Sequence, residues 1–238
     1  MNDPFRHHPR LQDMINNPED SSFRKQDMAA TLAWLEDAGI DTSDCFSEEV
    51  REANRIAALA DRRDTDLWVF AYGSLMWDPG FYFAEVRRAR VPGHSRQFIL
   101  KDDFGGRGTE ESPGVQAALD VGGNCDGLAF RVARDVLEEE SAMIWRREYI
   151  APAYHPVFLR AEISDGDIEV LAFLADHDAE PIRGDLTWDE KVSYLANGEG
   201  LFGSSFEYIE NIVERLEQLG IEDAHLRDLY GAAKKMRG

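Results

Sequence analysis

The chain has 238 residues, and its 26 lysines and arginines against 46 acidic residues give a formal net charge of -20 at pH 7. Hydrophobic residues make up 43% and charged residues 30%, a balance typical of a globular protein and not of a disordered one. The negative charge argues against non-specific binding to nucleic acid, which needs a basic surface. Apolar runs such as residues 67–72 are far shorter than a membrane span.

The start of the chain and its cysteines bear on the compartment. Met1 is followed by polar and charged residues instead of an apolar signal core, so we expect a cytoplasmic protein. Two cysteines, Cys45 and Cys125, are too few for a disulfide framework, which fits a reducing compartment. No pair of cysteines or histidines has the spacing of a zinc site, and we expect no metal.

The N-terminal part of the chain predicts a charged helical extension. Apolar residues at helical spacing predict a helix over residues 23–39. A second helix is predicted over residues 47–63, with Ser47 as its N-cap. A disordered lead of roughly 20 residues is expected before them. The chain therefore divides into an extension, residues 1–64, and a main domain, residues 65–238.

The main domain begins with strands and continues with helices. Residues 67–72 are nearly all apolar, which predicts a central strand buried on both faces. Further strands are predicted at residues 89–91 and 96–100 around a Pro92-Gly93 turn, at 115–119 and 127–132 around a glycine turn at 122–124, and in a hairpin of 157–163 with 168–175. Helices are predicted at residues 135–148, 187–196, 205–219 and 224–235. This order indicates a mixed α+β domain built around a largely antiparallel sheet or a small barrel.

The sharpest local feature is Tyr72-Gly73-Ser74-Leu75, at the end of the first predicted strand. Glycine permits a turn that points consecutive backbone N–H groups into one space, which suits a carboxylate or an oxyanion. The same short pattern is equally compatible with an ordinary turn that ends a strand. The residues alone leave both interpretations open.

A family resemblance extends this pattern. The sequence Phe70-Ala71-Tyr72-Gly73-Ser74-Leu75-Met76-Trp77 is similar to the glycine-rich signature of the γ-glutamylcyclotransferase superfamily, specifically its ChaC branch. The likeness continues in Arg107-Gly108-Thr109, in Trp145-Arg146-Arg147-Glu148-Tyr149 and in Glu207-Tyr208-Ile209. It spans residues 67–229 and leaves the N-terminal extension outside.

The resemblance implies a cyclotransferase fold, a small β-barrel flanked by helices, and cleavage of a γ-glutamyl amide to release 5-oxoproline. For ChaC proteins the substrate is glutathione, and the second product is cysteinylglycine. The catalytic glutamate of the family corresponds to Glu148, followed here by Tyr149 where many relatives have methionine or lysine. The family tyrosine shortly after it corresponds to Tyr154, although the four residues before Tyr154 differ from common versions.

This chemistry suits the residues. A γ-glutamyl amide carries its own nucleophile, the α-amino group, so the enzyme has to fold the substrate and move protons. Correct orientation contributes roughly 7–11 kcal/mol, and one carboxylate that serves both nitrogens contributes about 10²–10⁴-fold. Glu148 is the candidate acid/base, and the backbone N–H groups of Gly73, Ser74 and Leu75 are candidates for holding a carboxylate or the oxyanion. No metal or organic cofactor is required.

Arg107 is the candidate for binding a substrate carboxylate, because guanidinium binds carboxylate in a bidentate manner. An equally open interpretation is a surface loop arginine that pairs with Glu110 or Glu111.

Other functions stay open from the sequence. A serine hydrolase with Ser74 as nucleophile would need His94 or His155 as its base. A non-catalytic regulatory module of the same fold, or a cyclotransferase for another γ-glutamyl amine or peptide, is also compatible. The sequence does not indicate an oligomeric state.

Overall fold

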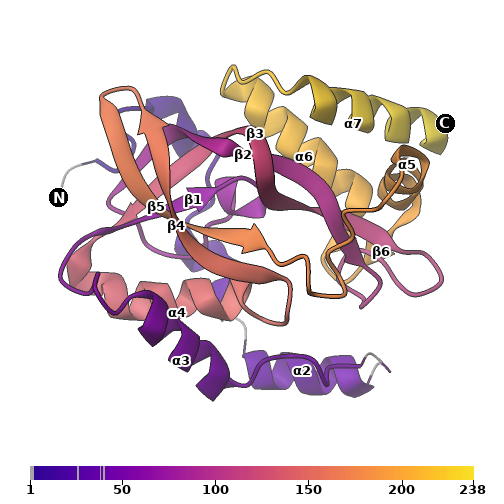
Figure 1. Ribbon diagram of the computed structural model, residues 1–238, viewed down its shortest axis with the longest axis horizontal. Helices are drawn as coiled ribbons and strands as arrows, with labels where there is room; N and C mark the ends of the chain where they lie inside the picture. Colours follow the sequence, from indigo (N-terminus) through magenta and orange to yellow (C-terminus); the bar gives the residue numbers. More distant parts are fainter. Residues whose placement is uncertain (1–2, 26, 38, 40) are drawn as a thin grey trace.

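The computed structural model describes residues 3–25, 27–37, 39 and 41–238, and within these ranges five strands close into a barrel (Figure 1). Their order around the barrel is β1-β3-β2-β4-β5. β1 lies between β3, with which it pairs antiparallel, and β5, with which it pairs parallel. The strands are β1 (Leu67–Ala71), β2 (Glu85–Asp102), β3 (Gly114–Val132), β4 (Tyr154–Ile163) and β5 (Gly166–Ala175).

The buried first strand and the predicted hairpin are confirmed. Val69, Phe70 and Ala71 of β1 are at most 1% exposed. β4 and β5 pair in register from Tyr154 opposite Ala175 to Ile163 opposite Gly166. The α+β fold class with a small barrel is therefore confirmed.

All residues of the four short strands predicted between 89 and 132 lie in strands, but the turns predicted to divide them are wrong, because β2 and β3 form one long antiparallel ribbon. The two predicted turns lie opposite each other, and the register shifts between Pro92 and His94. Gly93, Gly122 and Gly123 all have positive φ angles there. Glycine signals that read as turns in isolation therefore produce a bulge within paired strands.

The predicted helices of the main domain are confirmed with small shifts at their ends. Figure 1 shows α4 on one side of the barrel and the three C-terminal helices gathered on the other. Capping boxes begin α5, from Thr187 with Glu190, and α6, from Ser204 with Glu207. The helices are α4 (Leu137–Glu148), α5 (Trp188–Asn197), α6 (Ser205–Gln218) and α7 (Ala224–Arg237).

In the extension, the helix predicted over residues 23–39 is interrupted. It consists of α1 (Ser22–Lys25) and α2 (Met28–Asp37), while Gln26 and Ala38 of the predicted range lie outside the described residues. α3 (Glu48–Ala58) is capped by Ser47 as predicted and packs against α4.

The predicted disordered lead is wrong for residues 3–20. They form two short 3-10 helices, Pro9–Asp13 and Pro18–Asp20, and their Leu11 and Ile15 lie in the main hydrophobic core. The backbone N–H of Asn16 donates to the carbonyl of Trp77 at 2.7 Å. Two apolar residues among charged ones are too weak a local pattern to predict burial, because the surface that covers them comes from distant parts of the chain.

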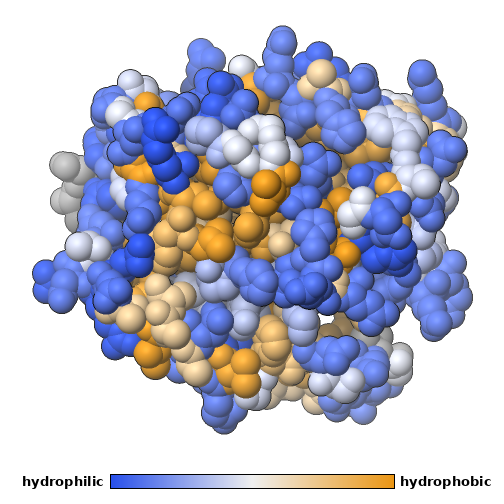
Figure 2. All heavy atoms as spheres, in the orientation of Figure 1, coloured by the Kyte–Doolittle hydropathy of each residue, from blue (hydrophilic) through white to orange (hydrophobic). Residues whose placement is uncertain are grey.

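The face drawn in Figure 2 is largely hydrophilic, with apolar side chains gathered near its middle over the barrel strands. Within the described ranges, no helix has both the length and the apolar character that crossing a membrane requires.

Candidate active site

The loop that follows β1 begins at Tyr72, which two hydrogen bonds hold in place. The backbone carbonyl of Tyr72 accepts a hydrogen bond from Arg96 Nε at 2.6 Å, and the Tyr72 hydroxyl donates to the carbonyl of Phe173 at 3.1 Å. Arg96 is 6% exposed, so this support comes from inside the barrel. After Tyr72 the chain turns at Gly73 into a single 3-10 turn, Ser74–Met76.

Gly73 is required by a close approach and not by its φ of -130°. A Cβ at this position would lie 2.7 Å from the hydroxyl oxygen of Tyr208, a residue of α6. In the described part of the chain, the backbone N–H groups of Gly73, Ser74 and Leu75 donate to no protein acceptor. These N–H groups are therefore unpaired within the described part of the chain.

We expect Gly73→Ala to destabilise the fold by about 1–3 kcal/mol, because the new methyl group overlaps the Tyr208 hydroxyl. Gly73→Ala combined with Tyr208→Phe should regain most of that loss, since the next ring atom, Tyr208 Cζ, lies 3.8 Å away at an ordinary contact distance. Thermal unfolding of both variants and of Tyr208→Phe measures this. A double variant no more stable than Gly73→Ala would contradict the assignment of the clash.

Glu148 is the last residue of α4, and its side chain is 18% exposed. Burial raises the pKa of Glu148 above its ordinary value of 4.5, while the charge of Arg147 and a hydrogen bond from it act in the opposite direction. Arg147 Nε lies 3.1 Å from the carboxylate. The carboxyl group therefore combines a restricted environment with an adjacent cation, Arg147.

Arg147 connects this carboxylate to the loop after β1. Its side chain is 4% exposed, its Nη2 donates to Ser74 Oγ at 2.8 Å, and its Nη1 donates to the carbonyl of Asp78. One buried guanidinium thus fixes Glu148 relative to Ser74. In the sequence Arg147 stands out only as part of the family pattern, because nothing local indicates that it is buried.

Three tyrosines lie close enough to Glu148 for its charge to act on their hydroxyl groups. Burial is the main reason why the pKa values of Tyr72, Tyr154 and Tyr208 are raised, and the charge of Glu148 raises each of them further. The structure therefore brings together Glu148, Tyr72 and Tyr154, which the sequence analysis selected. It adds Tyr208, whose only sequence signal is its place in the Glu207-Tyr208-Ile209 segment.

Arg107 lies in the loop between β2 and β3, and its guanidinium faces the ring of Tyr208. Its guanidinium carbon lies 4.8 Å from the centre of the Tyr208 ring, and its Nη1 donates to the carbonyl of Ser204 at 3.3 Å. Burial lowers the pKa of Arg107. No ion pair between described residues involves Arg107, so the alternative of pairing with Glu110 or Glu111 is not seen.

Asp102 shapes the loop that carries Arg107. This buried carboxylate accepts hydrogen bonds from the backbone N–H groups of Gly106 at 3.2 Å and Arg107 at 2.6 Å. A Cβ on Gly106 would lie 2.5 Å from Asp102 Oδ2, and one on Gly108 would lie 2.0 Å from the backbone nitrogen of Gly114. These glycines are therefore required by close packing.

Comparison with known proteins places this chain in a family. The model of the ChaC-like protein family matches residues 67–236. The chain belongs to the ChaC-like family. The family resemblance inferred from the sequence is thus confirmed.

Individual relatives of this ChaC-like protein agree. It is 33% identical over 199 residues to the "Glutathione-specific gamma-glutamylcyclotransferase" of Escherichia coli K12, covering 83% of this chain and 86% of that protein. It is 27% identical to the human "Glutathione-specific gamma-glutamylcyclotransferase 1", covering 74% and 83%. The crystal structure of a yeast gamma-glutamyl cyclotransferase specific to glutathione shares the fold, with a TM-score of 0.67 at 19% identity over 73% of this chain and 97% of that one.

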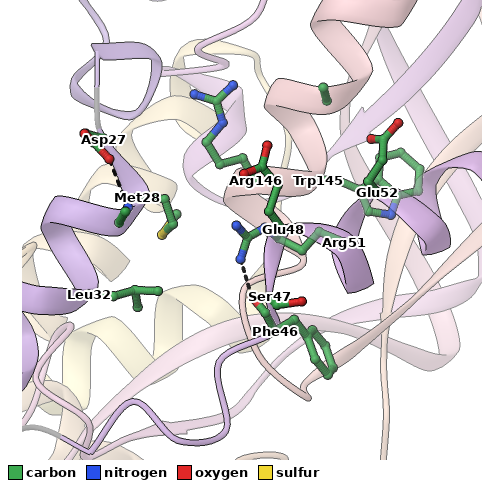
Figure 3. A pocket seen from close by; sticks show the side chains of 12 residues that line it. Asp27, Met28, Leu32, Phe46, Ser47, Glu48, Arg51, Glu52, Trp145 and Arg146 are labelled. Carbon is green, nitrogen blue, oxygen red and sulfur yellow. Dashed lines mark hydrogen bonds between the residues drawn. The ribbon is translucent and has the colours of Figure 1, made fainter.

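A cavity of about 540 Å³ lies elsewhere in this ChaC-like protein, between α2, α3 and α4 (Figure 3). Met28 and Leu32 line it from α2, and Trp145 and Arg146 line it from α4. Glu148 and the loop after β1 are not among its lining residues. The cavity is therefore separate from the candidate active site.

The hydrolase alternative finds no support in this ChaC-like protein. The side-chain partner of Ser74 is Arg147, whereas His155 lies against Asp176 and His94 against the carbonyl of Pro92. Ser74 thus has no histidine base among the described residues. Over the same residues, no three His, Cys, Asp or Glu side chains gather as metal ligands would.

Proposed function

We propose that this chain cleaves glutathione to 5-oxoproline and cysteinylglycine, with Glu148 as the acid/base. The observation that carries the proposal is one partly buried carboxyl group with a raised pKa, held by Arg147 beside a loop with free N–H groups. The printed names of the E. coli and human relatives support glutathione as the substrate. The family, the fold and the names of these relatives therefore agree on one enzyme class.

The reaction needs one proton carrier. Glu148 takes a proton from the α-ammonium group of the substrate, and the freed amine attacks the γ-carbonyl carbon to form a C–N bond. Glu148 gives this proton to the amide nitrogen of the cysteinyl residue, and the original C–N bond breaks. Glu148 then takes the excess proton from the new ring nitrogen and passes it to the departing amine, which leaves as an ammonium group, and the five-membered lactam remains. The carboxylate is regenerated, and nothing is oxidised or reduced. A pKa raised toward neutrality suits a group that both accepts and donates.

The loop supplies the electrostatic part. In this proposal the unpaired N–H groups of Gly73, Ser74 and Leu75 hold the negative oxygen that develops on the γ-carbonyl, or the α-carboxylate. The net charge of -20 repels an anionic substrate at long range, so local cations must compensate. Arg107 and Arg147 supply two such charges beside Tyr208 and Glu148.

For Arg107, the proposal predicts a role in substrate binding. Arg107→Lys keeps the charge but loses the bidentate geometry, so we expect KM for glutathione to rise about tenfold while kcat changes little. Arg88→Lys is the control, since Arg88 is an exposed arginine on β2. Steady-state kinetics of both variants decide the question. Equal KM values for Arg107→Lys and Arg88→Lys would remove Arg107 from the binding site.

Incubation of the purified protein with glutathione, followed by mass spectrometry of 5-oxoproline and cysteinylglycine, tests the function directly. Both products should appear in equal amounts. γ-Glutamylcysteine and other γ-glutamyl amines are assayed in parallel. Product only from one of these would keep the reaction and change the substrate, and product from none would reject the cyclotransferase proposal.

We further propose a cytoplasmic location and a division at residues 64/65 into an extension and a catalytic domain. The two free cysteines support the location, because a reducing compartment leaves thiols unpaired. The start of β1 at Leu67 and of the family match at residue 67 support the division.

A further inference from the structure

We infer that Phe23 of the N-terminal extension is a positioning residue of the active site, which holds Arg147 where it can bind Glu148 and Ser74. The inference rests on the proposed function, because it concerns the same carboxylate. It goes beyond the family match, which begins at residue 67. The extension is thereby assigned a catalytic purpose.

Phe23 covers the guanidinium that organises the site. The Arg147 guanidinium carbon lies 4.1 Å from the centre of the Phe23 ring, a distance at which cation and ring attract each other. The same guanidinium directs its N–H groups toward Ser74, Asp78 and Glu148. With the ring on its face and three acceptors at its edge, the group has one arrangement that satisfies all contacts.

The segment that carries Phe23 is anchored firmly. Arg24 donates two hydrogen bonds to the carboxylate of Glu140, at 2.7 and 3.0 Å, and one to the carbonyl of Gly80 at 3.2 Å. Glu140 is 1% exposed, and Ser21, at the start of the segment, is 2% exposed. A bidentate pair with a buried carboxylate fixes direction as well as distance. Phe23 is therefore held over Arg147 by its own neighbours.

Phe23 also reaches the loop of Arg107. Its ring lies 5.8 Å from that of Phe202, whose backbone N–H donates to the carbonyl of Gly106 at 2.8 Å. One side chain from the extension thus contacts two segments, one holding Arg147 and the other holding Arg107. Both arginines belong to the proposed site, so a displacement of Phe23 affects the carboxylate and the substrate-binding loop together.

The test compares Phe23→Ala with Phe5→Ala. Phe5 belongs to the same extension and makes an edge-to-face contact with Phe83 at 5.7 Å, which reproduces the loss of an aromatic contact without touching Arg147. We expect both variants to unfold at similarly lowered temperatures. Only Phe23→Ala should lower kcat for glutathione, by about ten- to a hundredfold, as expected for a misplaced catalytic group. Phe23→Tyr, which keeps the ring, should restore kcat.

A second comparison separates positioning from general loosening. In the Arg147→Lys background the ring has lost its guanidinium partner, so Phe23→Ala should lower kcat by much less than it does in the wild type. Equal kcat values for Phe23→Ala and Phe5→Ala, or fully additive effects with Arg147→Lys, would overturn the inference. Wild type and Glu148→Gln are measured in the same assay, because inactive wild type or active Glu148→Gln would instead reject the proposed function.

Discussion

Glu148→Gln should lower kcat for glutathione by about 10²–10⁴-fold at pH 7, because glutamine neither takes the proton from the α-ammonium group nor returns it to the leaving nitrogen. The amide oxygen can still accept from Arg147 Nε, which lies 3.1 Å from the native carboxylate. Substrate binding should therefore change less than turnover. Release of 5-oxoproline at saturating glutathione is the measurement.

The control for this variant is Glu217→Gln. Glu217 is also a glutamate in the last turn of a helix, in this case α6, but it is exposed and has no role in the proposed reaction. Its substitution should leave kcat unchanged. If Glu148→Gln retained wild-type turnover, the carboxylate would have no part in proton transfer, and another acid would have to be sought.

Thermal stability gives an independent check on Glu148. The pKa of this group is raised in the folded protein, so the folded state binds the proton more tightly than the unfolded chain does. Stability contributed by the protonated form is present at low pH and is lost as the pH rises through the unfolded and then the folded pKa. At pH 7, which lies above the unfolded pKa, the raised pKa therefore costs stability. Glu148→Gln removes that cost, so its Tm at pH 7 should not fall below that of the wild type.

Much of the barrel and the C-terminal helices could be predicted because their signals are local. The apolar run of β1 lies within one element, and β4 and β5 follow each other directly in the chain. α5 and α6 begin with capping boxes, where a hydroxyl and a glutamate three residues later satisfy the free N–H groups of the first turn. None of these features depends on a distant partner.

What could not be predicted depends on contacts between distant segments. The glycines near residues 93 and 122 read as separate turns, and only the pairing of β2 with β3 makes them one bulge. Glu148 and the loop after β1 were found through the family pattern, whereas Arg147 joins them by hydrogen bonds across 73 residues of sequence. The contact of Phe23 with Arg147 has no sequence signal at all.

Arg147→Met should move the acid side of the pH profile of kcat/KM to higher pH. The proposed base must be ionised in the free enzyme, so activity falls as the pH drops through the pKa of Glu148, which burial holds above 4.5. The charge of Arg147 and its hydrogen bond lower that pKa. Without them the pKa rises further, and part of the activity lost at neutral pH should return under more alkaline conditions.

Two further variants isolate the charge. Arg147→Lys retains the positive charge but cannot reach Ser74, Asp78 and Glu148 together. The plateau of its kcat/KM profile should therefore fall, while the acid limb of that profile stays near the wild-type position. Arg146→Met removes the neighbouring arginine, which faces the cavity lined by α2, and should change neither the plateau nor the acid limb. An Arg147→Met profile with only a lowered plateau would show that Arg147 acts through geometry alone. A shifted limb would show that the same guanidinium both places the carboxylate and sets the pH at which it works.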